Sequence, residues 1–354
     1  MPAPVFFTPC THDGGDVTAR ISALLSAVEL GSLITKGSLI ALKTHFGEEG
    51  NTTHVAPRHI RAFVDHVKSL GGLPYLTETS VLYKSQRMNA VAHTILAYSH
   101  GFTYEAVGAP IIMSDGLRGN LEREVDVNGD YYRKVPIAAD AVSPDAMIVI
   151  SHATGHLAAG LGAALKNLGM GLSSRKGKLN QHSKSKPHID REECTACEAC
   201  IRNCPVNAIA LHDGKARIDE AICIGCGECI TVCAFSAVGF RWDGASADLQ
   251  KKMAEHAAGV IKGMEGKLVY CNFLTNMTKD CDCISEDEKP IIPDIGILAS
   301  RDPVAIDMAT LDLTKRSSGK TLAALAFPAL DPLVQMIHAE RMGLGNRGYE
   351  LRTI

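Results

Sequence analysis

The chain has 354 residues, a formal net charge of −3 and 46% apolar residues. This charge excludes the strong basic field of a typical nucleic-acid-binding domain. No apolar run approaches the roughly 18 residues that suggest a bilayer-spanning helix, and the start of the sequence lacks a basic segment followed by a long apolar stretch. We therefore expect a cytoplasmic protein that binds neither membranes nor nucleic acids.

Residues 1–187 read as alternating strands and helices. The apolar patterns predict a strand at 39–42, a helix at 57–70, a helix at 86–98, a strand at 111–113, a strand at 147–150 and a helix at 157–168. This alternation is typical of βαβ units and predicts an α/β host built on a mostly parallel sheet.

Residues 188–243 interrupt this pattern with two copies of one cysteine motif. Each copy has the spacing C-x2-C-x2-C-x3-C, and the second follows the first at a constant offset of 29 residues. The cysteines are Cys194, Cys197, Cys200 and Cys204, then Cys223, Cys226, Cys229 and Cys233. This is the ligand spacing of bacterial ferredoxins. It predicts an inserted small α+β domain with two [4Fe-4S] clusters as cofactors, with a zinc module as the alternative.

The two motifs resemble those of two-cluster ferredoxins, in which the fourth cysteine of each run binds the cluster of the other run. The resemblance implies one ligand set of Cys194, Cys197, Cys200 and Cys233, and a second set of Cys223, Cys226, Cys229 and Cys204. The first run ends in Cys-Pro as in bacterial ferredoxins, whereas the second ends in Cys-Ala. We expect this departure to affect the shielding of a cluster more than its ligation.

The α/β pattern resumes in the second part of the host, residues 244–354. A helix is predicted at 249–264, strands at 268–270 and 295–298, and a helix at 304–313. A single host fold interrupted by a ferredoxin-like domain accounts for both halves better than three unrelated domains.

Polar residues follow several predicted strands, at the junctions where open α/β sheets bind ligands. The candidate catalytic residues at these junctions are His45, His152, His156, Lys166, Cys281, Cys283 and Asp294. Each histidine is a candidate base or metal ligand, or is simply hydrogen bonded. His152 and His156 would share one face of a helix, although Gly155 makes a turn equally plausible.

The other candidates also have two interpretations. Lys166 binds a carboxylate or phosphate, or lies on an exposed helix surface. Cys281 and Cys283 form a redox pair, ligate a third metal, or are buried inert thiols. Asp294 belongs to the site or caps the element that follows it.

A cationic stretch precedes the cysteine motifs. It contains Arg175, Lys176, Lys178, Lys184 and Lys186. The stretch is either a solvated linker or a loop in which Lys176 and Lys178 hold an anionic small-molecule ligand beside the site.

A resemblance to a known family rests on three runs of sequence, KTHFGEEGNT, SHATGHLAAGLGAALKNLGMG and CDC followed by PIIPDIGILASRDPVAID. These runs resemble the family catalogued as domain of unknown function 362, in its ferredoxin-containing form, over most of residues 36–315. The resemblance implies the architecture and the clusters, and it names no reaction. More remotely, the run GLGAALKNLGMG is similar to a segment of lactate-racemase-like proteins, which implies an active site between two α/β lobes.

The sequence predicts an iron–sulfur protein in which two [4Fe-4S] clusters pass single electrons to a site in the host. Such a protein would be a redox or cofactor-maturation enzyme with a redox partner protein. The alternative is a non-catalytic electron-transfer or metallocentre-assembly partner. The positions of the candidate residues distinguish the enzyme from the non-catalytic partner. In an enzyme, the candidates would converge on a cavity, whereas in a partner they would be dispersed over the surface. These candidates are His45, His152, Lys166, Cys281 and Asp294.

Overall fold

The structure is a computed structural model that describes residues 2–10, 16–182, 186–223, 225, 227–239 and 246–354. Cys226, one of the eight predicted cluster ligands, and Lys184 of the cationic stretch lie outside these residues. Within the described part of the chain, no helix is both long enough and apolar enough to cross a bilayer.

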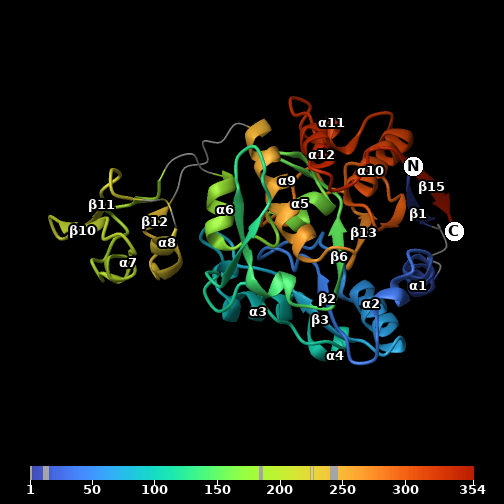
Figure 1. Cartoon of the computed structure of the whole chain (residues 1–354), viewed down its shortest axis with the longest axis horizontal. Helices are drawn as coiled ribbons and strands as arrows, with labels where there is room; N and C mark the ends of the chain where they lie inside the picture. The colour runs from blue at the N-terminus through green and yellow to red at the C-terminus, as the bar shows by residue number, and fades with distance from the viewer. Residues whose placement is uncertain (1, 11–15, 183–185, 224, 226, 240–245) are drawn as a thin grey trace.

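A seven-stranded sheet forms the centre of the host (Figure 1). Its order is β15 (Tyr349–Thr353), β1 (Ala3–Pro9), β14 (Gly296–Ser300), β13 (Leu268–Leu274), β6 (Ala146–His152), β2 (Leu39–Lys43) and β3 (Leu73–Thr77). Strand β14 is antiparallel to both of its neighbours, and the other neighbouring pairs are parallel. The predicted mixed α/β architecture with a mostly parallel sheet is confirmed.

Helices cover both faces of this sheet. Helices α1 (Val17–Ala27) and α2 (Pro57–Ser69) pack on one face. The other face carries α5 (Ala164–Gly169), α9 (Ser246–Gly263), α10 (Pro303–Ser318) and α12 (Leu333–Arg341). The remaining host elements are α3 (Ala90–Ser99), α4 (Tyr104–Val107), α6 (Arg175–His182), α11 (Leu322–Ala326), the hairpin of β4 (Glu122–Asp126) with β5 (Lys134–Ala138), and 3-10 turns at 30–33, 86–88 and 139–142.

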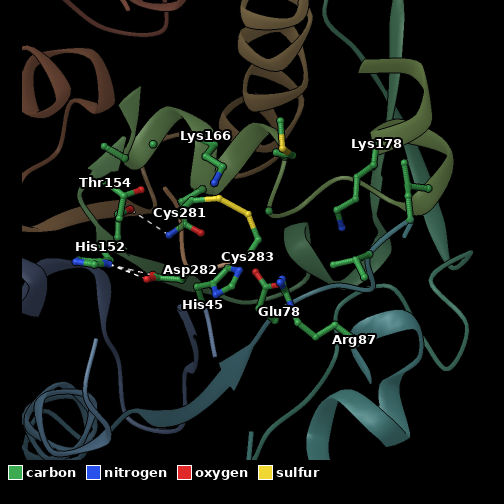
Figure 2. Close-up of a pocket in the computed structure, with 18 of the residues that line it drawn as sticks. His45, Glu78, Arg87, His152, Thr154, Lys166, Lys178, Cys281, Asp282 and Cys283 are labelled. Carbon is green, nitrogen blue, oxygen red and sulfur yellow. Dashed lines mark hydrogen bonds and ion pairs between the residues drawn. A yellow bond between two sulfur atoms is a disulfide. The ribbon is translucent and has the colours of Figure 1, made fainter. Parts of the chain in front are cut away.

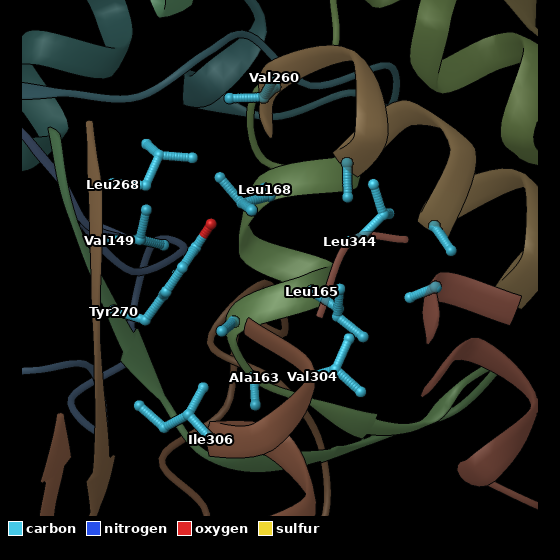
Figure 3. Packing of buried hydrophobic residues seen from close by; sticks show 14 of the residues in the cluster. Val149, Ala163, Leu165, Leu168, Val260, Leu268, Tyr270, Val304, Ile306 and Leu344 are labelled. Carbon is cyan, nitrogen blue, oxygen red and sulfur yellow. The ribbon is translucent and has the colours of Figure 1, made fainter. Parts of the chain in front are cut away.

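Strand β6 is buried along its whole length because helices cover both faces. Successive side chains of a strand point to opposite sides. Met147 and Val149 therefore join the core beneath α5, α9 and α10, where Val149 lies near Leu268 and Tyr270 (Figure 3). Ile148 and Ile150 join the core beneath α1 and α2. Two-sided burial explains why this strand appears in the sequence as a continuous apolar run.

Three predicted elements differ from the structure. The predicted helix at 86–98 is a 3-10 turn at 86–88 followed by α3. The predicted strand at 111–113 contributes only one bridge, between Ile111 and Leu76. The first half of the predicted helix at 157–168 is instead the hairpin of β7 (Thr154–His156) and β8 (Gly160–Gly162), with α5 after it. Glycine favours this hairpin, because Gly160 has φ +74° and a Cβ at Gly155 would lie 2.0 Å from the Lys279 carbonyl oxygen.

The cysteine-rich segment, residues 186–239, forms a small body beside the host (Figure 1). It contains two small antiparallel pairs, β9 (His188–Ile189) with β12 (Val238–Gly239) and β10 (Ile209–His212) with β11 (Lys215–Ile218), and two short helices, α7 (Ala199–Arg202) and α8 (Glu228–Val232). Leu82 and Leu179 of the host pack into its apolar core. The segment and the host therefore share a hydrophobic contact.

Candidate functional site

A cavity of about 110 Å³ lies at the carboxyl ends of β2, β3, β6 and β13 (Figure 2). These four adjacent strands are parallel, so their carboxyl ends lie at one edge of the sheet. Each strand is followed by, or ends in, a residue that lines the cavity. These are His45 after β2, Glu78 after β3, His152 at the end of β6 and Cys281 after β13.

Five of the seven candidate host residues line this cavity, namely His45, His152, Lys166, Cys281 and Cys283. The other two do not. His156 is buried at the end of β7, where its Nδ1 accepts a hydrogen bond from the Ala159 amide at 3.0 Å. Asp294 is exposed and accepts a hydrogen bond from the Asn276 amide at 2.6 Å, so it holds a loop. The helix that would have paired His152 with His156 is instead the end of strand β6 and strand β7.

His152 forms a buried ion pair with Asp282. Its Nδ1 lies 2.9 Å from Asp282 Oδ1, and its Nε2 lies 2.9 Å from the Thr275 carbonyl oxygen. Burial alone would lower the pKa of His152, but the Asp282 carboxylate and the backbone carbonyls raise it above its usual value. Because both ring nitrogens face acceptors, both carry protons. His152 therefore acts here as a cation that fixes the Asp282 loop, and neither nitrogen is available as a base.

We expect Asp282→Asn to destabilise the protein by about 3 kcal/mol, because it leaves His152 buried without its charge partner. His152 has a raised pKa, so its contribution is complete below its unfolded pKa of about 6.5 and is lost as the pH rises through the folded value. Asp282 has a lowered pKa, so its contribution is present above about pH 4 and is lost as the pH falls. Anaerobic thermal unfolding should show the largest difference from the wild type between about pH 4 and 6.5.

The exposed Asp294, which also accepts a backbone hydrogen bond, provides the matched control. Asp294→Asn should produce a much smaller change at pH 5. An Asp282→Asn deficit of equal size at pH 5 and pH 9 would contradict the ion pair.

His45 is a neutral imidazole. Burial holds its pKa well below the usual value, and the nearby cations Arg87 and Lys166 lower it further. Its Nδ1 accepts a hydrogen bond from the Gly47 amide at 3.0 Å, which places the ring proton on Nε2. In this tautomer His45 offers a hydrogen-bond donor, not a base, to a ligand in the cavity.

Glu78 is a cavity residue that the sequence analysis missed. Its carboxylate contacts Lys43 Nζ and lies 3.6 Å from the Arg87 guanidinium, and all three side chains are buried. Burial raises the pKa of Glu78, but Lys43 and Arg87 outweigh this and lower it to about 2. Arg87 also lies 3.6 Å from Glu48. The carboxylate is therefore ionised and holds two cations at the cavity wall.

Lys166 of α5 lines the cavity, and its side-chain ammonium makes no ion pair or hydrogen bond with the described residues. Burial, together with the nearby cations Arg87 and Lys43, lowers its pKa to about 8 against the opposing effect of Asp282. At neutral pH it carries an ammonium without a direct counter-ion. Lys166 is therefore free to bind an anion.

The cationic stretch is partly a helix, α6, and its two candidate lysines differ. Lys178 lines the cavity and donates to the carbonyl oxygens of Ser80 at 2.7 Å and Ser173 at 3.1 Å. Lys176 does not line the cavity and pairs with Glu122 at 3.2 Å. Of the two lysines predicted to hold an anion, only Lys178 lies at the cavity.

Cys281 and Cys283 form a disulfide at the cavity wall. The residue between them is held by three partners. The Asp282 carboxylate binds His152 and accepts a hydrogen bond from Thr53 Oγ1 at 2.8 Å, and the Asp282 carbonyl accepts one from the Glu48 amide at 2.8 Å. Figure 2 shows Lys166 pointing toward the disulfide. Of the three expectations for this pair, the redox pair is the one that a disulfide in the cavity suits.

The predicted cluster cysteines line two further small cavities. Cys194, Cys197, Cys200 and Cys233 line one of them. Cys204, Cys223 and Cys229 line the other. The seven described cysteines therefore divide as the crossed ligand sets do.

Two backbone amides donate to cysteine sulfurs of these cavities, from Ala216 to Cys194 at 3.5 Å and from Ala208 to Cys204 at 3.2 Å. Hydrogen bonds of this kind are among the features that set the potentials of iron–sulfur clusters. Among the described residues, no group of three or more His, Cys, Asp or Glu side chains is arranged to hold a single metal ion.

No curated protein matches this chain. Among solved structures, it is similar to the lactate racemase apoprotein from Thermoanaerobacterium thermosaccharolyticum, with 12% identity, a TM-score of 0.38 and coverage of 77% of this chain and 51% of the other. It is also similar to a structural-genomics protein from Thermotoga maritima, with 10% identity, a TM-score of 0.40 and coverage of 75% and 51%. The chain spans about half the length of each. A family model described as domain of unknown function (DUF362) matches residues 40–312, and the chain therefore belongs to the DUF362 family.

Proposed function

We propose that this protein is an iron–sulfur redox enzyme, in which two [4Fe-4S] clusters in the cysteine-rich segment supply single electrons to the cavity of the host. The observation that carries the proposal is that the host cavity and the cysteine-rich segment have a residue in common. Leu82 lines the host cavity and also belongs to the apolar core that contains Cys194, Cys200, Cys229 and Cys233.

Other contacts support the same route between the segment and the cavity. Arg175 of α6 donates to the Ile230 carbonyl of α8 at 3.4 Å. The backbone at Gly227 approaches Leu179 so closely that a Cβ would lie 3.1 Å from it. Helix α8 lies on the side of the segment nearer the host, and α7 lies farther away (Figure 1). Helix α8 contains Cys229 of one cysteine set and is followed directly by Cys233 of the other, so residues of both sets lie on this side of the segment.

Two features of the cavity lined by Cys194 suit a redox partner protein. Cys197, a member of that cysteine set, is exposed. Phe235, which lines the same small cavity, is 45% exposed. A partner that docks on these side chains would deliver electrons to that cysteine set.

The charged cavity favours an enzyme over a non-catalytic carrier. An electron carrier requires only its clusters and a docking surface, whereas this host encloses His45, Lys166 and Lys178 around a space at the ends of four strands. The three side chains present a donor and two cations, which suit an anionic small-molecule substrate.

Anaerobic purification should yield about eight iron atoms and eight acid-labile sulfides per chain, because each complete ligand set holds four of each. Cys271→Ser should retain this content, because Cys271 is buried in the host sheet and belongs to neither motif. Stoichiometric zinc without labile sulfide would overturn the proposal.

A further inference from the structure

We propose that the Cys281–Cys283 disulfide is the electron acceptor of the host cavity, which collects two electrons and becomes a pair of thiols facing the substrate. This inference rests on the proposed function, because the electrons that reduce the disulfide come from the reduced [4Fe-4S] clusters. It adds the identity of the group that the electrons reach.

The position of the disulfide suits redox chemistry better than a structural role. It closes a loop with a single residue between its cysteines, and so short a loop constrains the unfolded chain little. The loop is already anchored without it, through the ion pair of Asp282 with His152 and the hydrogen bond from Thr53. When the S–S bond opens, these contacts hold the two sulfurs in place at the cavity wall.

The cavity also supplies charge to the sulfurs. Reduction breaks the S–S bond, gives one electron to each sulfur and takes two protons from solvent to form two thiols. Negative charge develops on sulfur before the protons arrive, and a neighbouring cation favours the thiolate. Lys166 is that cation, because it lines the same cavity, lacks a counter-ion among the described residues and points toward the disulfide (Figure 2).

Two adjacent residues connect the disulfide loop to the cysteine-rich segment. Leu82 packs in the apolar core of the segment, as described above. Its neighbour Tyr83 lines the cavity and donates a hydrogen bond to the Cys283 carbonyl at 3.4 Å. The dipeptide therefore contacts both the proposed donor site and the proposed acceptor.

An electron count tests the inference directly. Anaerobic coulometric titration of the holoprotein should consume about four electrons per chain, one for each of two clusters and two for the disulfide. Cys281→Ser should consume about two while retaining its iron. The matched control, Cys271→Ser, also lacks one buried cysteine and should consume about four.

Alkylation provides a second measurement that requires no change at the disulfide. After reduction with dithionite and denaturation, mass spectrometry should find Cys281 and Cys283 alkylated in the wild type. In a Cys194→Ser/Cys223→Ser variant treated identically, the two cysteines should remain disulfide bonded. Protein with full iron content that consumes only two electrons and keeps the disulfide intact would overturn this inference and leave the proposed function standing. If the anaerobically purified protein contained no iron, both this inference and the proposed function would be overturned.

Discussion

Cys204→Ser is expected to remove about half of the iron, because Cys204 completes the set with Cys223 and Cys229 although it belongs to the other motif in sequence. Serine is a poorer ligand for iron–sulfur clusters than a thiolate. The cluster of the set with Cys204, Cys223 and Cys229 should be lost or weakened, and the cluster of the set with Cys194 should remain. Iron and sulfide counting, with electron paramagnetic resonance of the reduced protein, measures both.

Two double variants decide whether the ligands cross. Cys204→Ser/Cys223→Ser should lose no more iron than Cys204→Ser alone, because both side chains line one cavity. Cys204→Ser/Cys194→Ser should lose nearly all iron, because Cys194 lines the other cavity. If Cys204→Ser/Cys194→Ser retained half of the iron and Cys204→Ser/Cys223→Ser lost all of it, each motif would hold its own cluster.

Glu78→Gln is expected to cost about 3 to 5 kcal/mol in the free energy of unfolding. The substitution leaves Lys43 and Arg87 buried beside a neutral amide. At roughly 2 °C or more per kcal/mol, the midpoint of anaerobic thermal unfolding should fall by about 6 °C or more. Because the pKa of Glu78 is lowered to about 2, its contribution is complete above its unfolded pKa of about 4 and is lost as the pH falls toward 2.

The difference from the wild type should therefore remain constant from about pH 5 to pH 8. Glu124→Gln is the control, because this exposed carboxylate lies 3.8 Å from Lys176. It should change stability by less than about 1 kcal/mol. If Glu78→Gln changed the stability no more than Glu124→Gln does, the buried charges would contribute little to stability.

The sequence predicted the edge of the sheet at which the site lies, because buried strands and polar junctions both leave clear patterns. Strands β2, β6 and β13 appear as apolar runs, and His45, His152 and Cys281 follow or end them. Parallel pairing then brings distant residues to one edge.

Glu78 was missed because its strand was missed. Strand β3 contains Pro74, and a proline counts against a strand in the sequence although it is tolerated at the edge of a sheet. Arg87 lies in a 3-10 turn within a predicted helix, so no strand-end pattern marked it. Helix α6 was not predicted because it contains Gly177, and glycine counts against a helix in the sequence. The fold requires glycine at this position, because a Cβ there would lie 2.4 Å from the Pro136 carbonyl oxygen. These three errors arise from tertiary packing, which local patterns do not record.

The ends of helices α6 and α9 flank the cysteine-rich segment, and the two helices pack against each other within the host. Lys252 of α9 donates to the Asn180 carbonyl of α6 at 3.1 Å, close to the point of departure. The segment between α6 and α9 is equivalent to one long surface loop of the host, because the packing of the two helices already holds its ends together. The entropic cost of closing such a loop rises only slowly with its length. Removal of residues 186–239 would therefore break no strand of the seven-stranded sheet, and it would expose chiefly the apolar contact of Leu82 and Leu179.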